Sequence, residues 1–469
     1  MLPRYKYTIT KPPAGSALPS AAELWLGQGL RLHQRGDLAG AKAQYNALRQ
    51  AQPDHPAAMH LLGVVACQQE DYSQAVELIG RAVGLQPDNA AFLLNYGNAL
   101  HGAGQHGEAV ESFSRSLALR PGVAEAHFNR GNAQRALRRL KLAFADYEQA
   151  VSLDPSLVEA WWSAAFTLLL AGDYERGLPL YEWRTRRAGY RLLNTARPQW
   201  IGREPLEGKC ILLHAEQGLG DTIQFCRYIP LVAQRMAKVI LQLPEELAPL
   251  LRDIEGVDQL VVRGQPLPEF DCHTPLLSLP LALGTRLDSI PPVSGRIAST
   301  PEARVLWEGR LGAAMKTRIG VVWSSTSGFE DDHNRSVALA DFVRALPQGS
   351  FDYICLQKDL KDSDKAALAM RGDIRFFGDQ IRNFADTAAL VDSVDLVVST
   401  CTAVPHLSAT MGKPTWLLLA HAPDWRWQLE GTTTPWYPAA RLYRQPTIGD
   451  WASVFATVHA DLKALSTRI

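Results

Sequence analysis

Three segments of the chain carry side chains whose types and spacing suit proton transfer and anion binding. The first, residues 214–225, reads HAEQGLGDTIQF and runs from a strand end through a Gly-x-Gly turn into a helix. After Gln217, Gly218 and Gly220 let the backbone approach a substrate closely, and Asp221 falls at the helix start. A carboxylate there can cap the helix, or remove a proton from an acceptor hydroxyl within hydrogen-bond reach. The two roles are compatible.

The second segment, residues 399–408, reads STCTAVPHLS and also runs from a strand into a helix. Proline is tolerated only in the first helical turn, where its missing N–H is no loss, so Pro405 places the helix start near Thr402. The free N–H groups of Thr402 and Ala403, at the positive end of the helix dipole, suit a diphosphate, with His406 one turn further in. The alternative is an ordinary turn with a capping threonine and a packed histidine.

The third segment, residues 323–336, is a polar loop after a strand. Arg335 can pair bidentately with phosphate oxygens, and the hydroxyls of Ser324 and Ser325 can donate hydrogen bonds to them. The alternative is a solvated loop, which a charge-rich stretch usually is.

Two further strand ends point towards the same edge. Gln357 and Lys358 follow one strand, and Lys358 is either a phosphate or ribose contact or a solvated lysine. Residues 424–427, reading DWRW, follow another. We expect Trp425 and Trp427 in the core rather than as an acceptor platform.

Beyond Arg187, short β-rich runs alternate with helical stretches, which predicts parallel sheets. The expected strands are 210–214, 239–243 and 259–262 in a first block, then 318–323, 353–356, 374–376, 396–399 and 415–418 in a second. The expected helices are 222–236, 244–252, 339–345, 384–390 and 404–411. Two such domains, joined by the Pro/Gly/Ser-rich stretch 291–301, would leave a ligand-binding cleft between the carboxyl ends of their strands.

Residues 198–465 contain a series of short motifs, which are EQGLGD at 216–221, NRS at 334–336, LQK at 356–358, FADT at 384–387, TAVPH at 402–406, GKP at 412–414 and APDWRW at 422–427. In the order and spacing of these motifs, this part of the chain resembles the bacterial inverting glycosyltransferases of the heptosyltransferase type, in the branch with N-terminal helical repeats. The resemblance implies a GT-B fold, in which two Rossmann-like domains face each other. The N-terminal domain would hold the acceptor and the C-terminal domain the nucleotide-sugar donor, with no metal and no other cofactor.

By position, the resemblance makes Asp221 the general base, Arg335 the basic donor contact, and Thr402, Ala403 and His406 the phosphate-binding turn. The chain departs from the family at Cys401, where aspartate is usual, and at Pro405, where alanine is common. If that aspartate contacts the donor, its loss changes the donor or weakens turnover. If it only shapes the turn, cysteine suffices.

The N-terminal part of the chain is periodic. Prolines 53, 87, 121 and 155 fall at 34-residue intervals, and the same spacing relates glycines 29, 63, 97 and 131, alanines 41, 75, 109 and 143, and the bulky residues Tyr45, Ile79, Phe113 and Tyr147. This pattern resembles the tetratricopeptide repeat. The small residue lets the second helix approach the first, the bulky residue fills the gap between neighbouring hairpins, and proline stops the second helix. A fifth unit begins at Trp161 and departs from the pattern before its expected proline.

These patterns predict four parts, which are an N-terminal tail (1–20), about five repeats (21–187), an acceptor-side lobe (188–300) and a donor-side lobe (301–469). The expected fold class is therefore an all-α repeat superhelix followed by an α/β GT-B enzyme.

The charge composition of the chain limits the classes of partner that it can bind. The 48 basic and 48 acidic side chains balance, which argues against nucleic acid and anionic membrane surfaces because both require a one-sided positive field. The sequence shows neither a signal peptide nor an apolar run long enough for a membrane span, so we expect a cytoplasmic protein. Six scattered cysteines with no CxxC pair indicate neither a disulfide framework nor structural zinc.

The leading hypothesis is a metal-independent, inverting glycosyltransferase whose repeats recruit a protein acceptor. We expect a protein acceptor rather than a glycolipid because the concave surface of such repeats binds peptides. Two alternatives stay open: a non-catalytic repeat scaffold with a degenerate GT-B domain, and a transferase that acts on a lipopolysaccharide or polysaccharide precursor.

Overall fold

The computed structural model describes residues 20–191, 193–293, 297–325 and 335–467. The chain divides into two compact units after Leu168. The predicted N-terminal tail, apart from residue 20, lies outside the described residues, as do residues 326–334 of the predicted polar loop.

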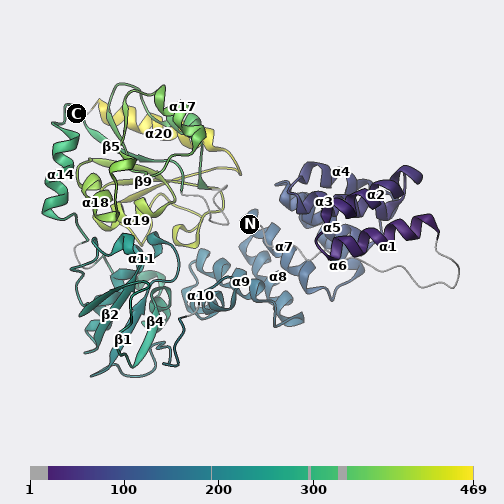
Figure 1. The fold of residues 1–469 in the computed structure, drawn as a ribbon, viewed down its shortest axis with the longest axis horizontal. Coiled ribbons are helices and arrows are strands. Elements are labelled where there is room, and N and C mark those ends of the chain that lie inside the picture. The colour runs from purple at the N-terminus through teal and green to yellow at the C-terminus, as the bar shows by residue number, and fades with distance from the viewer. Residues whose placement is uncertain (1–19, 192, 294–296, 326–334, 468–469) are drawn as a thin grey trace. The chain divides into compact units, whose positions relative to one another are not determined.

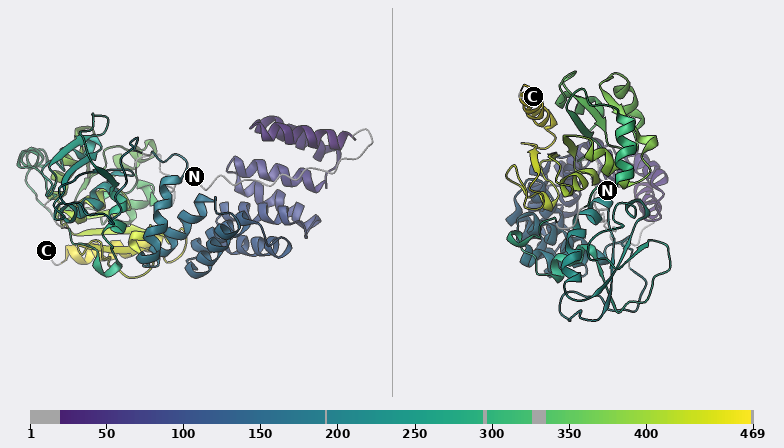
Figure 2. Two further views of the ribbon diagram at one scale, coloured as in Figure 1. Left: turned by 90° about the horizontal axis from the view of Figure 1, so that it is seen from below. Right: turned by 90° about the vertical axis from the view of Figure 1, so that its left-hand side faces the viewer.

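The first unit is built from helical hairpins (Figures 1 and 2). Its helices are α1 (Ala21–Gln34), α2 (Leu38–Ala51), α3 (Pro56–Gln68), α4 (Tyr72–Leu85), α5 (Ala90–Gly102), α6 (His106–Leu119), α7 (Ala124–Ala136), α8 (Leu140–Leu153) and most of α9 (Val158–Leu170). The second helix of each of the first four hairpins ends two residues before one of the periodic prolines, so their predicted role as helix stops is confirmed.

Close helix approach within each hairpin explains the periodic glycines. A Cβ added at Gly97 would lie 2.5 Å from the ring of Phe113, and one added at Gly29 would lie 2.4 Å from Tyr45. Tyr45 also packs in one cluster with Leu61 and Val65 of the next hairpin. The bulky residue therefore packs against the glycine of its own hairpin as well as filling the gap between hairpins.

The fifth hairpin differs from the others. Its second helix, α10 (Tyr174–Tyr181), contains Pro179 and continues into the 3₁₀ helix η1 (Glu182–Arg186). Because the unit boundary follows Leu168, α10 and η1 belong to the second compact unit, although the sequence pattern extends the repeats to residue 187.

The second unit contains two parallel sheets, each with its own helices. The first lobe holds a four-stranded sheet in the order β3-β2-β1-β4, made of β1 (Cys210–His214), β2 (Lys238–Leu243), β3 (Gln259–Val262) and β4 (Cys272–Pro275). Its helices are α11 (Leu219–Phe225), η2 (Cys226–Tyr228), α12 (Ile229–Ala233), η3 (Glu245–Leu247), η4 (Leu276–Ser278), α13 (Leu279–Ala282) and η5 (Leu287–Ser289).

The second lobe holds a six-stranded parallel sheet in the order β10-β9-β8-β5-β6-β7, a doubly wound arrangement. Its strands are β5 (Arg318–Val322), β6 (Asp352–Cys355), β7 (Ile374–Phe376), β8 (Leu396–Thr400), β9 (Thr415–Leu419) and β10 (Ala440–Arg444). Its helices are α14 (Pro301–Leu311), α16 (Leu339–Phe342), η6 (Val343–Ala345), α17 (Asp362–Ala369), η7 (Gly378–Gln380), α18 (Phe384–Asp392), α19 (Ala403–Thr410), η8 (Trp425–Trp427) and α20 (Trp451–Ser466).

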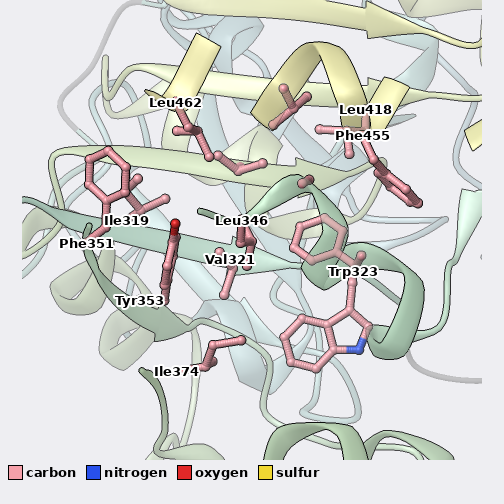
Figure 3. Packing of buried hydrophobic residues seen from close by; sticks show 14 of the residues in the cluster. Ile319, Val321, Trp323, Leu346, Phe351, Tyr353, Ile374, Leu418, Phe455 and Leu462 are labelled. Carbon is pink, nitrogen blue, oxygen red and sulfur yellow. The ribbon is translucent and has the colours of Figure 1, made fainter. Parts of the chain in front are cut away.

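One face of the second sheet carries a continuous apolar core. Val321 and Tyr353 point from adjacent strands towards Phe455 and Leu462 of α20, and Trp323 closes one end of the cluster (Figure 3). The helices α14, α18 and α19 lie on the opposite face (Figure 1). Both faces are covered, which explains why the inner strands β5, β8 and β9 read as largely apolar runs.

All eight predicted strands are present to within one residue at either end. Two strands were missed: β4, with the sequence CHTP, and the edge strand β10, with the sequence ARLYR, lack a long β-branched run. The helix predicted at 244–252 is wrong, because only the 3₁₀ turn η3 forms there, and the one predicted at 222–236 is broken into α11, η2 and α12. In the described part of the chain, every helix is too short or too polar to cross a bilayer.

Candidate functional site

Several of the predicted site residues lie in loops that follow the strands next to the topological switch point of each sheet, where the strand order changes direction. In the second lobe this point lies between β5 and β8, and the loops after these strands carry Ser324 and Thr402. In the first lobe it lies between β1 and β4, and the loop after β1 leads to Asp221. Open parallel sheets bind ligands at such positions.

The two lobes meet where the N-termini of α11 and α19 lie side by side (Figure 1). A Cβ added at Gly220 would lie 2.8 Å from Cδ2 of His406 and 3.1 Å from Cα of Ala403. Glycine is therefore required for the contact between the lobes, whereas the sequence suggested that it admits a substrate. We call this contact, together with the packing of residues 424–437 on the first lobe, the interlobe seam.

Asp221 is the third residue of α11, and it caps that helix. Its Oδ2 accepts a hydrogen bond of 3.0 Å from the N–H of Gly218, the N-cap residue. Its Oδ1 accepts one of 2.5 Å from Nη2 of Arg426 in the second lobe. Burial raises the pKa of Asp221, and the Arg426 guanidinium and the Gly218 N–H oppose that shift. The side chain keeps 19% exposure at the interlobe seam, and Gln217 beside it is exposed.

Arg426 was not among the predicted site residues. Its guanidinium is 6% exposed and donates to Asp424 Oδ1 at 2.9 Å and to Gln224 Oε1 at 2.6 Å, in addition to Asp221. The signal in the sequence was the arginine within the apolar DWRW segment, because a buried arginine requires carboxylate partners.

The N-terminus of α19 forms as predicted. Thr402 is the N-cap, the helix begins at Ala403, and Pro405 occupies its first turn. The Thr402 hydroxyl makes no capping hydrogen bond. Its Oγ1 and that of the fully buried Thr400 have no hydrogen-bond partner among the described residues. Buried hydroxyls without a partner are uncommon and favour a bound ligand or water at this point.

His406 is buried behind the start of α19. Its Nδ1 lies 2.9 Å from the Tyr437 hydroxyl, and its ring centroid lies 5.3 Å from that of Trp427. Burial lowers the pKa of His406 well below its ordinary value, and nearby arginines, among them Arg426 and Arg335, act in the same direction. His406 is therefore neutral at physiological pH and can supply a hydrogen bond but no positive charge.

Cys401 directly precedes the N-cap residue of α19 and carries a neutral thiol. The Trp427 indole N–H lies 3.2 Å from its Sγ, and burial raises the pKa of Cys401 to about 11. The two tryptophans of the DWRW segment are each 1% exposed, which confirms their predicted place in the core.

Loops after β5 and β6 supply the remaining predicted contacts. Gln357 is 7% exposed, and its Oε1 accepts from the N–H groups of Trp323 and Ser324 while its Nε2 donates to the Ser324 hydroxyl. The N–H of Ser325 donates to the Ser336 hydroxyl. Gln357 thus braces the loop, and Lys358 is exposed beside it.

Arg335 lies close enough to Cys401 and His406 for its charge to lower the pKa of both side chains. Arg335 therefore lies within electrostatic range of the start of α19.

Sequence reasoning also missed a buried network that holds the loop before Asp221. Arg184 donates from Nε and Nη2 to the two Glu216 carboxylate oxygens, at 3.1 and 2.8 Å, and both side chains are 1% exposed. The Tyr190 hydroxyl and the N–H of Leu277 also donate to Glu216. The segment that follows α10 is therefore built into the first lobe. In the described ranges, no three His, Cys, Asp or Glu side chains are grouped to hold a metal ion.

Comparison with known proteins identifies the repeats. Tetratricopeptide-repeat family models match residues 26–78, 60–124 and 124–157. Protein FlbA of Caulobacter vibrioides is 24% identical over 332 residues, which cover 64% of this chain and 54% of FlbA. The alignment thus spans about half the length of this curated relative.

Solved structures similar to this chain include a MamA crystal structure (20% identity, 34% of this chain and 92% of that chain, TM-score 0.32). MamA from Desulfovibrio magneticus RS-1 is 19% identical, and the match covers 37% of this chain and 100% of that chain with a TM-score of 0.34. A thermophilic tetratricopeptide-repeat protein of Thermus thermophilus is 20% identical, and the match covers 36% of this chain and 91% of that chain with a TM-score of 0.31. The family models show that the N-terminal region consists of tetratricopeptide repeats, which are protein-interaction modules.

Proposed function

We propose that this chain is a GT-B glycosyltransferase that moves a sugar from a nucleoside-diphosphate-sugar to an acceptor hydroxyl. One observation carries the proposal. The Asp221 carboxylate of the first lobe and the N-terminus of α19 in the second lobe belong to helices that touch at Gly220. The proposed proton acceptor and the proposed anion-binding helix start therefore lie on opposite sides of one seam.

In the proposed reaction, Asp221 accepts the proton of the acceptor hydroxyl as that oxygen attacks the anomeric carbon. The bond from this carbon to the diphosphate breaks on the opposite face, so the configuration inverts. The diphosphate leaves towards the start of α19, where the N–H groups at Thr402 and Ala403 and the Arg335 guanidinium offset its charge. The unpartnered hydroxyls of Thr400 and Thr402 support a ligand at this position.

The proposed acceptor is a protein. Tetratricopeptide repeats bind peptides and protein partners along an extended surface, and here they precede the proposed transferase in one chain. Recruitment by the repeats would raise the local concentration of an acceptor side chain at the interlobe seam.

The test uses the full-length chain. A thermal-shift screen against UDP-, GDP-, ADP- and CMP-sugars identifies the donor, because a ligand that binds the native state raises its apparent stability. Transfer and donor hydrolysis are then measured for the wild type and for Asp221→Asn, which keeps the shape of the side chain. We expect the Asp221→Asn variant to bind the donor with unchanged affinity and to transfer about 10²–10⁴-fold more slowly, the usual range for loss of a general base. Equal rates in both proteins would refute the role of Asp221.

A second candidate is a non-catalytic scaffold, and Cys401 is the observation that favours it. A half-buried neutral thiol stands where the transferases that this sequence resembles usually have aspartate. This interpretation predicts that the wild type neither hydrolyses nor transfers any of the four classes of donor, although one of them still stabilises the chain in the thermal-shift screen.

A further inference from the structure

The Asp221 carboxylate is held in place from across the interlobe seam. Arg426 donates to it from Nη2, while its Nη1 and Nε are committed to Asp424 and Gln224. Each of the three nitrogens has its own acceptor. The guanidinium therefore cannot turn away from Asp221 without losing hydrogen bonds in both lobes.

Aromatic rings fix the same guanidinium from the sides. Its Cζ lies 4.7 Å from the ring centroid of Trp425 and 5.3 Å from that of Phe225. Trp425 packs in turn against Tyr174 and Tyr181 of α10, with ring centroids 5.7 and 6.0 Å apart. Arg426 is thus placed as firmly as a core residue, although it carries a charge.

We propose that Arg426 is a positioning residue of the transfer reaction, which orients the Asp221 carboxylate and keeps it an anion. The inference rests on the proposed function of Asp221 as the base. It assigns a role to the DWRW segment, whose arginine reaches a helix 205 residues earlier in the chain.

The charges around Asp221 explain why an arginine is required. Asp424 and Glu216 both raise the pKa of Asp221, as burial does, and Tyr181 of α10 lies within electrostatic range. Of the charged groups that shift this pKa, Arg426 has the largest effect, and it lowers the pKa. Glu216 already has its own partner in Arg184. From α19, the neutral His406 faces the neighbouring Gly220.

The sign of the effect follows. Burial favours the protonated acid, and a cation within hydrogen-bond distance favours the carboxylate. Loss of the cation therefore raises the pKa of Asp221 further, and less of the base is ionised at a given pH. If transfer depends on the carboxylate, the fall of the transfer rate on the acid side of its pH profile, the acid limb, then begins at a higher pH than in the wild type.

The experiment compares Arg426→Gln, Arg426→Lys and a control, Arg444→Gln, in the full-length chain. Arg444 donates to the carbonyls of Trp427, Gln428 and Glu430, so it supports the same loop without touching Asp221. We expect the acid limb of the transfer rate to move up by about one pH unit or more in R426Q. In R426K the charge remains, so the limb should stay near its wild-type pH while kcat falls at least about tenfold because the forked geometry is lost. The control should leave the limb in place.

A second measurement does not depend on activity. The Asp221 side chain is titrated by ¹³C NMR in protein labelled at aspartate Cγ, with the resonance assigned by its absence in Asp221→Asn. The titration midpoint should rise by about one pH unit or more in R426Q and remain unchanged in R444Q. An unchanged midpoint in R426Q overturns the inference. If R426Q does not fold, a raised kcat or an acid limb displaced by a full pH unit in R426K overturns it instead.

The two readouts separate the inference from the proposed function. If the wild type transfers sugar and R426Q keeps its acid limb, the inference fails and the function stands. If the midpoint shifts but the wild type transfers to no acceptor, the function fails and the role of Arg426 in it fails too.

Discussion

Substitution of Gly220 by alanine tests the contact between the lobes most directly. The new Cβ would lie 2.8 Å from the His406 ring and 3.1 Å from Cα of Ala403, both closer than the 3.4 Å at which ordinary van der Waals contact begins. The second neighbour is backbone and cannot rotate away. Such overpacking costs about 1–3 kcal/mol.

The matched control is Gly309→Ala in α14 of the same unit. A Cβ at Gly309 meets nothing within 4 Å, so this substitution should raise the free energy of unfolding by about 0.5–1 kcal/mol through helix propensity alone. Gly220 is also helical and gains a similar amount, so Gly220→Ala should lower the free energy of unfolding by about 0–2.5 kcal/mol, the difference between these terms.

Urea unfolding followed by tryptophan fluorescence measures both variants on the same unit. The seam contains Trp425, Trp427 and Trp436, each at most 1% exposed, so separation of the lobes changes the signal. Under the proposed function, the transfer rate of Gly220→Ala should also fall, because Asp221 and the start of α19 move apart. If Gly220→Ala stabilises the chain as much as Gly309→Ala does, the lobes do not meet at this point and the proposed site is refuted.

Three further predictions concern stability. Gly97→Ala should lower the free energy of unfolding of the repeats by about 1–3 kcal/mol, because its Cβ would meet an aromatic ring at 2.5 Å. Gly84→Ala should not lower it, because its Cβ meets nothing within 4 Å. Thermal unfolding followed by circular dichroism distinguishes the two variants. Burial lowers the pKa of His60 to about 3, so below pH 6.5 the unfolded chain binds a proton at His60 that the folded chain does not. This proton lowers the free energy of unfolding by about 1.4 kcal/mol for each unit by which the pH falls. His60→Gln should make stability depend less on pH in this range, and an unchanged dependence contradicts the lowered pKa of His60. Arg184→Met leaves a buried carboxylate unpaired and should cost about 3–5 kcal/mol in urea unfolding. Arg344→Met should cost less than about 1 kcal/mol, because the side chains of the Arg344–Asp341 pair are 66% and 53% exposed. Similar losses in the two variants would contradict the role of the buried network.

Local signals in the sequence predicted the elements that depend on local chemistry. The 34-residue spacing predicted the hairpins, because each one satisfies the same steric requirement at a glycine such as Gly97. Pro405 predicted the start of α19 near Thr402, since proline fits only the first helical turn, and the expected helix at 404–411 differs from α19 by one residue at each end. Asp221 was placed correctly at a helix start for the same kind of reason.

Features that depend on distant partners could not be predicted in this way. The partners Arg426 and Asp221 are 205 residues apart, and Arg184 and Glu216 come from segments that sequence alone assigned to different domains. Neither pair has a fixed spacing that a periodicity or a short motif reveals. The edge strand β10 was missed because its two arginines, Arg441 and Arg444, make so short a segment resemble a solvated loop.

Because α10 belongs to the second unit, the periodic pattern does not mark the point at which the repeats can be exchanged or removed. Tyr174, Tyr181 and Arg184 are buried within that unit, so a graft made at the apparent end of the periodic pattern would remove part of its interior. Whole 34-residue modules between α1 and α8 lie upstream of these residues. Duplication or loss of such modules would change the length of the repeat array and leave α10 in place in the second unit.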